Sequence, residues 1–308
     1  MLLKKFSGIL DPRIQRRLLR DNALFVPNRS LPAYAGIQAV EDQFAIPLLG
    51  NRALLRTEER EEEKNYYWLL RKAGLPTPKK ISNPKDINCL TVVKLRHKKK
   101  RLERGFFTAS SPAEYKKKSE QLLRQNVISK EDLETSRIEE YVLGPVFNLD
   151  FFYSPLVGGT RGIELLGIDW RFESSLDGHV RLPAAQQLSL PETQANPEYV
   201  VVGHNAATLR ESLLEEAFAM ARKYVVTTQR LFSPGILGPF TLQTCVDQDM
   251  KFKIFDVAPR IGGGTNIHMW GGHPYGNALW RTRMSTGRRI ALEVRRAVEQ
   301  GRLNRLIT

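Results

Sequence analysis

The chain has 308 residues, of which 42% are apolar and 26% are charged, and these values exclude wholesale disorder and fibrous architectures. Its 47 Lys and Arg residues exceed its 33 Asp and Glu residues, and the net charge of +14 indicates an anionic partner: a nucleic acid, a nucleotide or a phosphorylated metabolite. No apolar run approaches the ~18–20 residues that cross a bilayer, and Cys89 and Cys245 are too far apart to suggest a zinc ribbon or a disulfide framework. We therefore expect a protein of the reducing cytoplasm with no membrane partner.

The first part of the chain predicts short elements followed by a boundary. Asp11-Pro12 is typical of a helix start, with aspartate as the cap and proline in the first turn. Residues 23–26 predict a short buried strand, and residues 57–72 predict a strongly charged helix that ends at Gly74. A stiff, proline-containing linker follows, and we place the first domain boundary there.

Strand-like segments dominate the rest of the chain. The predicted strands are 90–94, 105–108, 137–142, 146–153, 163–172, 240–243 and 252–256. Helices are predicted at 111–123, 209–224 and 290–298, where apolar residues recur at helical spacing. Interleaved helices and antiparallel-looking strands indicate an α+β or mixed α/β fold.

Common nucleotide and hydrolase motifs are absent from the sequence: GxxxxGK[ST], GxGxxG, HExxH and GxSxG. Scattered polar residues remain. Lys94 ends a β-branched strand, where its ammonium either reaches nucleotide phosphates or is simply solvated. Glu139 and Glu140 precede Tyr141 and Val142, which would wall a purine, unless this is an edge strand with outward acids.

A second group of polar residues lies near the end of the chain. If the strands that carry Gln243 and Asp256 form a hairpin, the side-chain oxygens of both residues can bind one hard cation such as magnesium. Magnesium accepts so few protein ligands because it also binds water molecules and substrate phosphates. The alternative is two unconnected polar residues. Arg260 follows, and after it the glycine turn 262–264, whose exposed N–H groups suit an anion.

Several long runs carry a family resemblance. They are IEEYVLG at 138–144, FYSPL at 152–156, ELLGID at 164–169, RFES at 171–174, RESLL at 210–214, GPF at 238–240, the glycine turn through Thr265 and Asn266, and segments 26–34 and 50–52. Over nearly its whole length, the chain resembles the archaeal formate-dependent phosphoribosylaminoimidazolecarboxamide ligases, which are ATP-grasp enzymes of purine (IMP) biosynthesis.

This resemblance implies an ATP-grasp fold preceded by a truncated, Rossmann-like pre-ATP-grasp domain. The implied divisions are 1–80 for the remnant of the ribotide-binding domain, 81–136 for the small lid subdomain, and 137–308 for the large subdomain with the metal site. It also implies a homo-oligomer.

The resemblance implies a reaction as well. ATP phosphorylates formate to formyl phosphate, which the 5-amino group of aminoimidazolecarboxamide ribotide attacks. The family's site residues correspond here to Lys94, Glu139, Glu140, Tyr141, Val142 and Glu173 for ATP, Gln243 and Asp256 for magnesium or manganese, Ser30, His204 and Asn266 for the ribotide, and Arg260 as a catalytic group.

The chain departs from the family at the ribotide side and the lid. It starts after the family's additional βαβ-like segment, and its lid segment 96–104 is basic instead of glycine-rich. His204 replaces the family's ribotide-binding asparagine, and Asp256 replaces its glutamate metal ligand. These differences predict slow ribotide formylation.

Two alternative functions stay open at this point. One is a diverged nucleotide-binding paralogue with little activity. The other is a nucleic-acid-binding protein that uses the basic segment 96–104, although no aromatic residues interleave there as stacking platforms.

Overall fold

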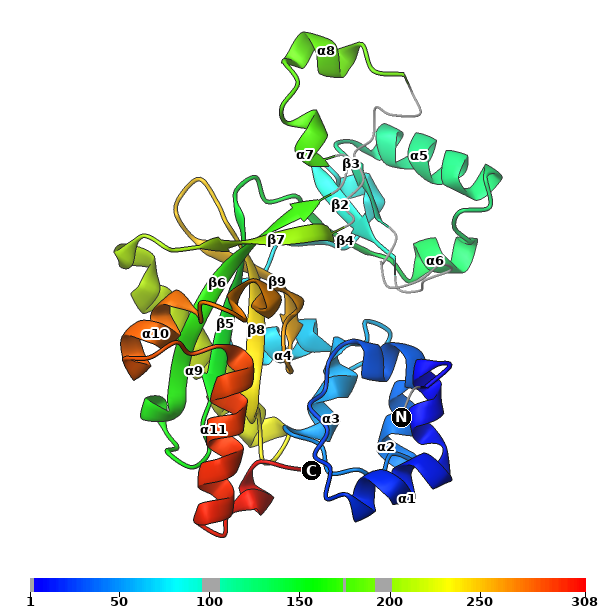
Figure 1. The fold of residues 1–308 in the computed structure, drawn as a ribbon. Helices are drawn as coiled ribbons and strands as arrows, with labels where there is room; N and C mark the ends of the chain where they lie inside the picture. The colour runs from blue at the N-terminus through cyan, green and yellow to red at the C-terminus, as the bar shows by residue number, and fades with distance from the viewer. Residues whose placement is uncertain (1–2, 96–105, 174–175, 192–200) are drawn as a thin grey trace.

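The computed structural model describes residues 3–95, 106–173, 176–191 and 201–308. The described chain has three parts: N-terminal helices, a small sheet with its helices at the top of Figure 1, and a large sheet between and beside them. No helix in the described ranges is both long enough and apolar enough to cross a bilayer.

The N-terminal part contains α1 (Pro12–Arg20), α2 (Ile37–Asp42), α3 (Arg52–Leu55) and α4 (Tyr66–Lys72). The predicted helix start is confirmed, because the Asp11 carboxylate accepts a hydrogen bond from the Arg13 N–H at 2.7 Å. The predicted strand 23–26 is wrong and reduces to a single bridge between Phe25 and Leu48.

The predicted charged helix 57–72 is also wrong in its first half. A short turn at Arg56–Glu58 is followed by irregular chain, and the helix starts only at Tyr66. The intervening residues are mostly glutamates, whose like charges do not support a helix. Asn65 caps α4 instead, since its side chain accepts from the Trp68 N–H at 3.2 Å.

Among the described residues, a four-stranded antiparallel sheet has the order β1-β4-β2-β3. Its strands are β1 (Lys80–Ile81), β2 (Thr91–Lys94), β3 (Phe106–Ala109) and β4 (Arg137–Glu140). Helices α5 (Pro112–Arg124) and α6 (Lys130–Glu134) lie between β3 and β4 in sequence and beside this sheet in space. Because β4 completes the sheet, the small subdomain extends past the predicted boundary at residue 136.

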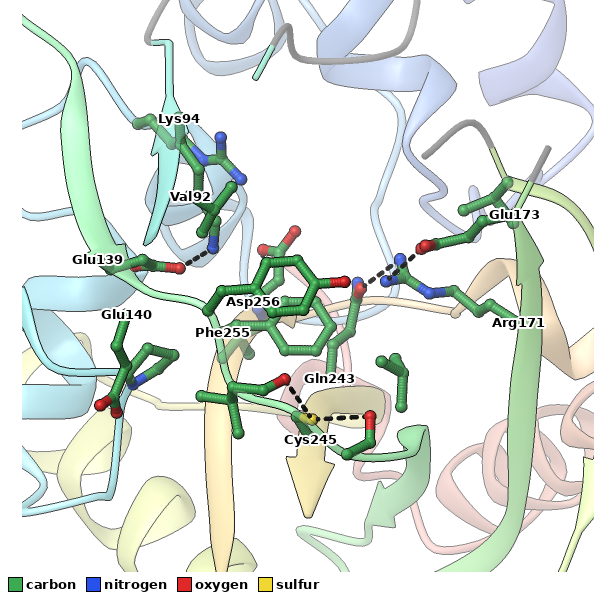
Figure 2. A pocket seen from close by; sticks show the side chains of 18 of the residues that line it. Val92, Lys94, Glu139, Glu140, Arg171, Glu173, Gln243, Cys245, Phe255 and Asp256 are labelled. Atoms are coloured by element: carbon green, nitrogen blue, oxygen red, sulfur yellow. Dashed lines mark hydrogen bonds and ion pairs between the residues drawn. The ribbon is translucent and has the colours of Figure 1, made fainter. Parts of the chain in front are cut away.

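The large sheet has the described order β7-β6-β5-β8-β9, with antiparallel neighbours throughout. Its strands are β5 (Val146–Tyr153), β6 (Ile163–Glu173), β7 (Val201–Ala207), β8 (Gly238–Val246) and β9 (Phe252–Ala258). The predicted hairpin is confirmed: β8 pairs with β9, and Gln243 lies directly opposite Asp256 (Figure 2).

Among the described residues, six short helices (α2, α3, α6, α7, α8 and α10) and two strands (β1 and β7) were not predicted. Short helices α7 (Leu176–His179) and α8 (Ala184–Leu188) follow β6, and α10 (Pro274–Trp280) follows the glycine turn. Strand β7 is an edge strand with no fully buried residue, so its sequence lacks a clean alternation of apolar and polar side chains.

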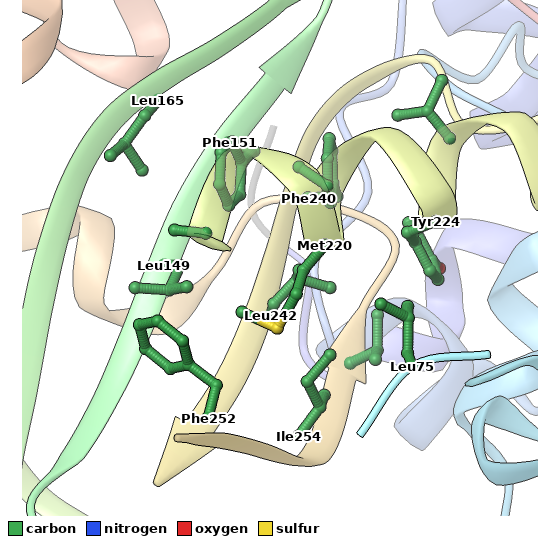
Figure 3. Close-up of a cluster of buried hydrophobic side chains, with 14 of the residues drawn as sticks. Leu75, Leu149, Phe151, Leu165, Met220, Tyr224, Phe240, Leu242, Phe252 and Ile254 are labelled. Carbon is green, nitrogen blue, oxygen red and sulfur yellow. The ribbon is translucent and has the colours of Figure 1, made fainter. Parts of the chain in front are cut away.

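The two faces of the large sheet are covered by different helices. Helix α9 (Glu211–Leu231) packs its apolar side on one face, where side chains from β5, β8 and β9 form the main core (Figure 3). Helix α11 (Thr286–Glu299) covers part of the other face, where Phe152 and Leu166 meet Ile290. Further along that second face, β5 presents polar side chains instead, Asn148 and Asp150.

The end of the chain returns to the N-terminal part. The N–H groups of Leu48 and Gly50 donate to the carbonyls of Thr308 and Leu306, at 3.0 and 2.8 Å. These backbone bonds join the first part of the chain to the subdomain that contains α11.

We expect Phe240→Ala to lower the free energy of unfolding by about 3–5 kcal/mol. The Phe240 ring is 1% exposed and stacks on Phe151 and Tyr224, with centroid distances of 5.4 and 5.5 Å. Denaturant titration measures the change. Leu188→Ala is the control, because Leu188 is 89% exposed and its truncation should cost less than about 0.5 kcal/mol. Equal effects of the two changes would contradict this core assignment.

Candidate active site

A cavity of about 360 Å³ lies where the two sheets meet the N-terminal part. Its lining includes every site residue predicted from the sequence except Ser30, His204 and Asn266: Lys94, Glu139, Glu140, Tyr141, Val142, Glu173, Gln243, Asp256 and Arg260. Figure 2 shows Lys94 and Glu139 on one side of this cavity and Arg171, Glu173 and Gln243 on the other. Residues far apart in sequence are therefore brought together, while their individual roles stay predictions.

Lys94 is held in a buried polar network. Its ammonium forms an ion pair with Glu139, which is 1% exposed, and donates to the Tyr67 hydroxyl at 3.0 Å. Glu139 also accepts from Tyr67 at 2.9 Å and from Arg137 at 2.8 Å. Burial alone would raise the pKa of the Glu139 carboxyl, but Lys94 and Arg137 outweigh burial and lower it. Glu139 is thus a carboxylate that fixes Lys94 at the cavity wall.

One part of the cavity is apolar. Val92, Val142, Val146 and Phe255 line it, from both sheets. The Cys245 thiol lies there too, and burial raises its pKa to about 11, so it is a protonated thiol and not a nucleophile. Flat apolar walls beside the backbone of residues 140–142 suit a purine base.

The opposite part of the cavity is polar. Arg171 donates to Gln243 Oε1 at 3.2 Å, pairs with Glu173 at 3.2 Å, and its guanidinium carbon lies 5.3 Å from the Phe255 ring centre. Across the hairpin, Asp256 Oδ1 accepts from the Val257 N–H at 2.9 Å. The sequence analysis predicted Glu173 as a site residue but not Arg171. Residues two apart on a strand share one face, so the position of Glu173 could have indicated Arg171.

The side-chain oxygens of Gln243 and Asp256 fit a hard cation that takes most of its ligands from water and from the substrate. Within the residues that the structure describes, no group of three or more His, Cys, Asp or Glu side chains could hold a metal ion. Magnesium needs no such cage, because it keeps waters and shares substrate phosphates. Two oxygen donors on paired strands beside cationic side chains match that requirement.

The N-terminal part completes the site with charged residues that sequence reasoning missed. Glu58 accepts from Arg260 at 3.0 Å and lies 3.6 Å from the Arg29 guanidinium. Arg29 also pairs with Glu59, and Arg60 lines the same cavity. The signal for Arg29 was its place beside Ser30 in a family-like run, whereas Glu58 and Arg60 lie in a charged stretch that gives no local clue.

The three predicted ribotide contacts lie outside this cavity. Ser30 follows Arg29, and its N–H donates to the Asn28 side chain at 3.0 Å. Asn266 is exposed on the short helix η6 (Gly263–His268). His204 lies on β7 and contacts Asp169. The basic lid segment 96–104 lies outside the described residues.

Two sheets that enclose a nucleotide-sized cavity, with Lys94 on the small sheet and the paired Gln243 and Asp256 on the large one, are the arrangement of an ATP-grasp ligase. Comparisons with known proteins agree. A family model described as a domain of unknown function (DUF1297) matches residues 114–308, and one described as a protein of unknown function (DUF1246) matches residues 1–81.

A relative from Methanobrevibacter smithii, 5-formaminoimidazole-4-carboxamide-1-(beta)-D-ribofuranosyl 5'-monophosphate synthetase, is 40% identical over 100% of this chain and 82% of its own length. The crystal structure of an IMP biosynthesis protein PurP from Thermococcus kodakaraensis superposes with a TM-score of 0.70 and 29% identity, covering 99% of this chain and 84% of that one. Phosphoribosylamine–glycine ligase from Thermotoga maritima shares the fold, with a TM-score of 0.52 and 13% identity over 80% of this chain and 58% of that one. The chain belongs to the family of 5-formaminoimidazole-4-carboxamide ribonucleotide synthetases.

We expect Glu139→Gln to lower the free energy of unfolding by about 3 kcal/mol at neutral pH, because it leaves Lys94 and Arg137 buried without their carboxylate. Since the pKa of Glu139 is lowered from its ordinary 4.5, this contribution is present above pH 4.5 and is lost as the pH falls through the folded-state pKa. Urea titrations of wild type and variant should therefore converge in acid.

The matched control for this prediction is Glu120→Gln. Glu120 is half-exposed and lies 4.0 Å from Lys116, so its pair should contribute less than about 0.5 kcal/mol. A pH-independent difference between wild type and Glu139→Gln would contradict the ionised state assigned to Glu139.

Proposed function

We propose that this chain uses ATP and formate to formylate the 5-amino group of aminoimidazolecarboxamide ribotide, a step of purine (IMP) biosynthesis. The observation that carries the proposal is the meeting of Lys94, Arg260 and the Gln243–Asp256 pair in one cavity of an ATP-grasp fold. Family membership over the full chain supports it. A reducing cytoplasm and a homo-oligomeric state belong to the same proposal.

ATP would lie across the cavity. Its adenine fits the apolar part between Val92, Val146 and Phe255. Its phosphates fit the polar part, where Lys94 faces Arg171 across the cavity and Arg260 also contributes to the lining. Lys94 would serve as a compact ammonium for the phosphates, whereas the arginines present planar forks that match phosphoryl oxygens.

Gln243 and Asp256 would hold magnesium or manganese. When bound, the metal supplies neutralisation of the negative charge that develops on the phosphoryl oxygens. Arg171 already donates a hydrogen bond to Gln243 Oε1, so its guanidinium orients this amide oxygen. The guanidinium would also add a positive charge to that of the metal.

The reaction needs two transfers in one enclosed place. The γ-phosphoryl group passes to a formate oxygen to give formyl phosphate, and the ribotide amine then displaces phosphate. Positioning contributes a large share of the rate in such reactions, because reacting atoms must be held about 3–3.5 Å apart. Arg260 suits the acyl phosphate, since Glu58 and the Ile261 carbonyl fix its guanidinium, at 3.0 and 2.8 Å.

The direct test is product formation by the full chain with ATP, magnesium, formate and the ribotide. We expect the formamide ribotide by mass spectrometry, together with one ADP for each product. Nucleotide binding without any formamide product would favour the diverged nucleotide-binding paralogue instead. Tight, salt-dependent binding of duplex nucleic acid without ATP binding would favour the nucleic-acid alternative.

We expect Asp256→Asn to lower the rate of formate-dependent ADP formation by about 100-fold, because a metal that neutralises phosphoryl charge contributes several kcal/mol. Calorimetric titration should also show weaker magnesium dependence of nucleotide binding. Asp249→Asn is the matched control, since Asp249 lies exposed in the turn between β8 and β9. If both variants retained full activity, the metal assignment would be wrong.

A further inference from the structure

A row of polar side chains crosses the large sheet at one level. Asp256 lies opposite Gln243, Gln243 opposite Asn148, and Asn148 opposite Asp169. Residues directly opposite each other in antiparallel strands place their side chains on the same face. With strands about 4.8 Å apart, the row extends about 14 Å from the predicted metal ligands to Asp169.

Asp169 ends this row and holds a histidine. Its carboxylate is 0% exposed, and Oδ1 accepts from Asn148 Nδ2 at 2.9 Å and lies 2.5 Å from His204 Nδ1. Because the same oxygen accepts from an amide, we assign it as the acceptor for the imidazole too, so Nδ1 carries the proton. This assignment leaves Nε2 as the nitrogen that a ligand meets.

The glycine turn after Arg260 lies directly over this pair. A Cβ atom on Gly264 would lie 2.1 Å from Asp169 Oδ2, so only glycine lets the backbone come so close. A Cβ atom on Gly263 would lie 3.9 Å from His204 Nε2, which is ordinary contact. The turn therefore covers Asp169, whereas the His204 side chain keeps 20% of its surface exposed.

His204 also lies close to the phosphoryl side of the site. In the sheet register it is opposite Arg171, which bonds Gln243. With formyl phosphate at Gln243, Asp256 and Arg260, a ribotide that lies along the same face, toward β6 and β7, would bring its attacking amine to His204.

We propose that His204 is the general base for the attacking amine of this reaction, and that Asp169 is its positioning residue; the inference rests on the proposed function. The amine nitrogen forms a bond to the formyl carbon, and the bond from that carbon to the phosphate oxygen breaks. The amine proton passes to His204 Nε2, the electron pair leaves on phosphate, and the imidazolium then returns the proton to phosphate. Products are the formamide and hydrogen phosphate.

The charged surroundings of the pair come from three elements. Asp169 and Arg171 lie on β6, and His268 on η6 interacts with Asp169. Asp150 on β5 lies beside Asp169, and burial together with the Asp169 charge raises the pKa of the Asp150 carboxyl. Burial and the Asp169 charge thus favour the neutral form of the Asp150 carboxyl over a second negative charge beside the pair.

The test compares wild type, His204→Gln and Asp169→Asn in the full chain with ATP, magnesium, formate and ribotide. We expect each change to lower kcat for formamide formation by about 100-fold. Formate-dependent ADP formation without ribotide should stay within about threefold of wild type. The pH profile of wild-type kcat should have an acid limb that His204→Gln lacks.

Two further arms separate catalysis from structure. Imidazole in the buffer should restore part of the activity of His204→Ala, which a structural role would not allow. His179→Gln, on α7 outside the cavity, should match wild type. If Asp169→Asn does not fold, the His204 variants decide alone.

The outcomes are distinct. A rise in the KM for ribotide with unchanged kcat would overturn the inference and make His204 a phosphate contact. Unchanged kinetics in His204→Gln would overturn it as well. Absence of formamide from the wild type would instead overturn the proposed function.

Discussion

The register of the large antiparallel sheet is the constraint on which the site depends. Side chains alternate between faces, so a slip of one residue in β8 would turn Gln243 into the α9 core and bring Leu242 to the cavity. The same register places Asn148 and Asp169 in line with Gln243. Packing and chemistry are therefore specified together, because the α9 face accepts only apolar side chains.

Buried interactions on both faces hold that register. On the α9 side, Phe240 stacks between Phe151 and Tyr224 from a neighbouring strand and from the helix. On the other side, Arg289 of α11 is fully buried and bonds Glu164 of β6 at 2.8 and 2.9 Å. A buried arginine is tolerated only with its carboxylates in place, so α11 has one well-defined position on the sheet.

Local patterns predicted the hairpin and the strands that carry Lys94 and Glu139, because short strands with β-branched residues and nearby turns are encoded in adjacent residues. They did not reveal Asp169 or Arg171, whose partners lie on β5, β7 and β8, since pairing between distant strands has no local signal. The charged stretch before α4 misled for a related reason: Glu58 is not on a solvated helix but is buried against Arg260. Its tertiary partner lies 202 residues further along the chain.

The cations that face the cavity are balanced within the protein itself. Lys94 is paired with Glu139, and Arg260 with Glu58, so each cation is held by a carboxylate that is almost fully buried. Such pairs make burial of the cations tolerable and fix their positions before a polyanion arrives, which is what electrostatic preorganisation requires. Glu58 comes from the N-terminal part, which the C-terminal residues 306–308 join to the large subdomain by backbone hydrogen bonds. The site is thus a property of all three parts together, and the divisions at 80 and 136 do not separate units that could perform this chemistry alone.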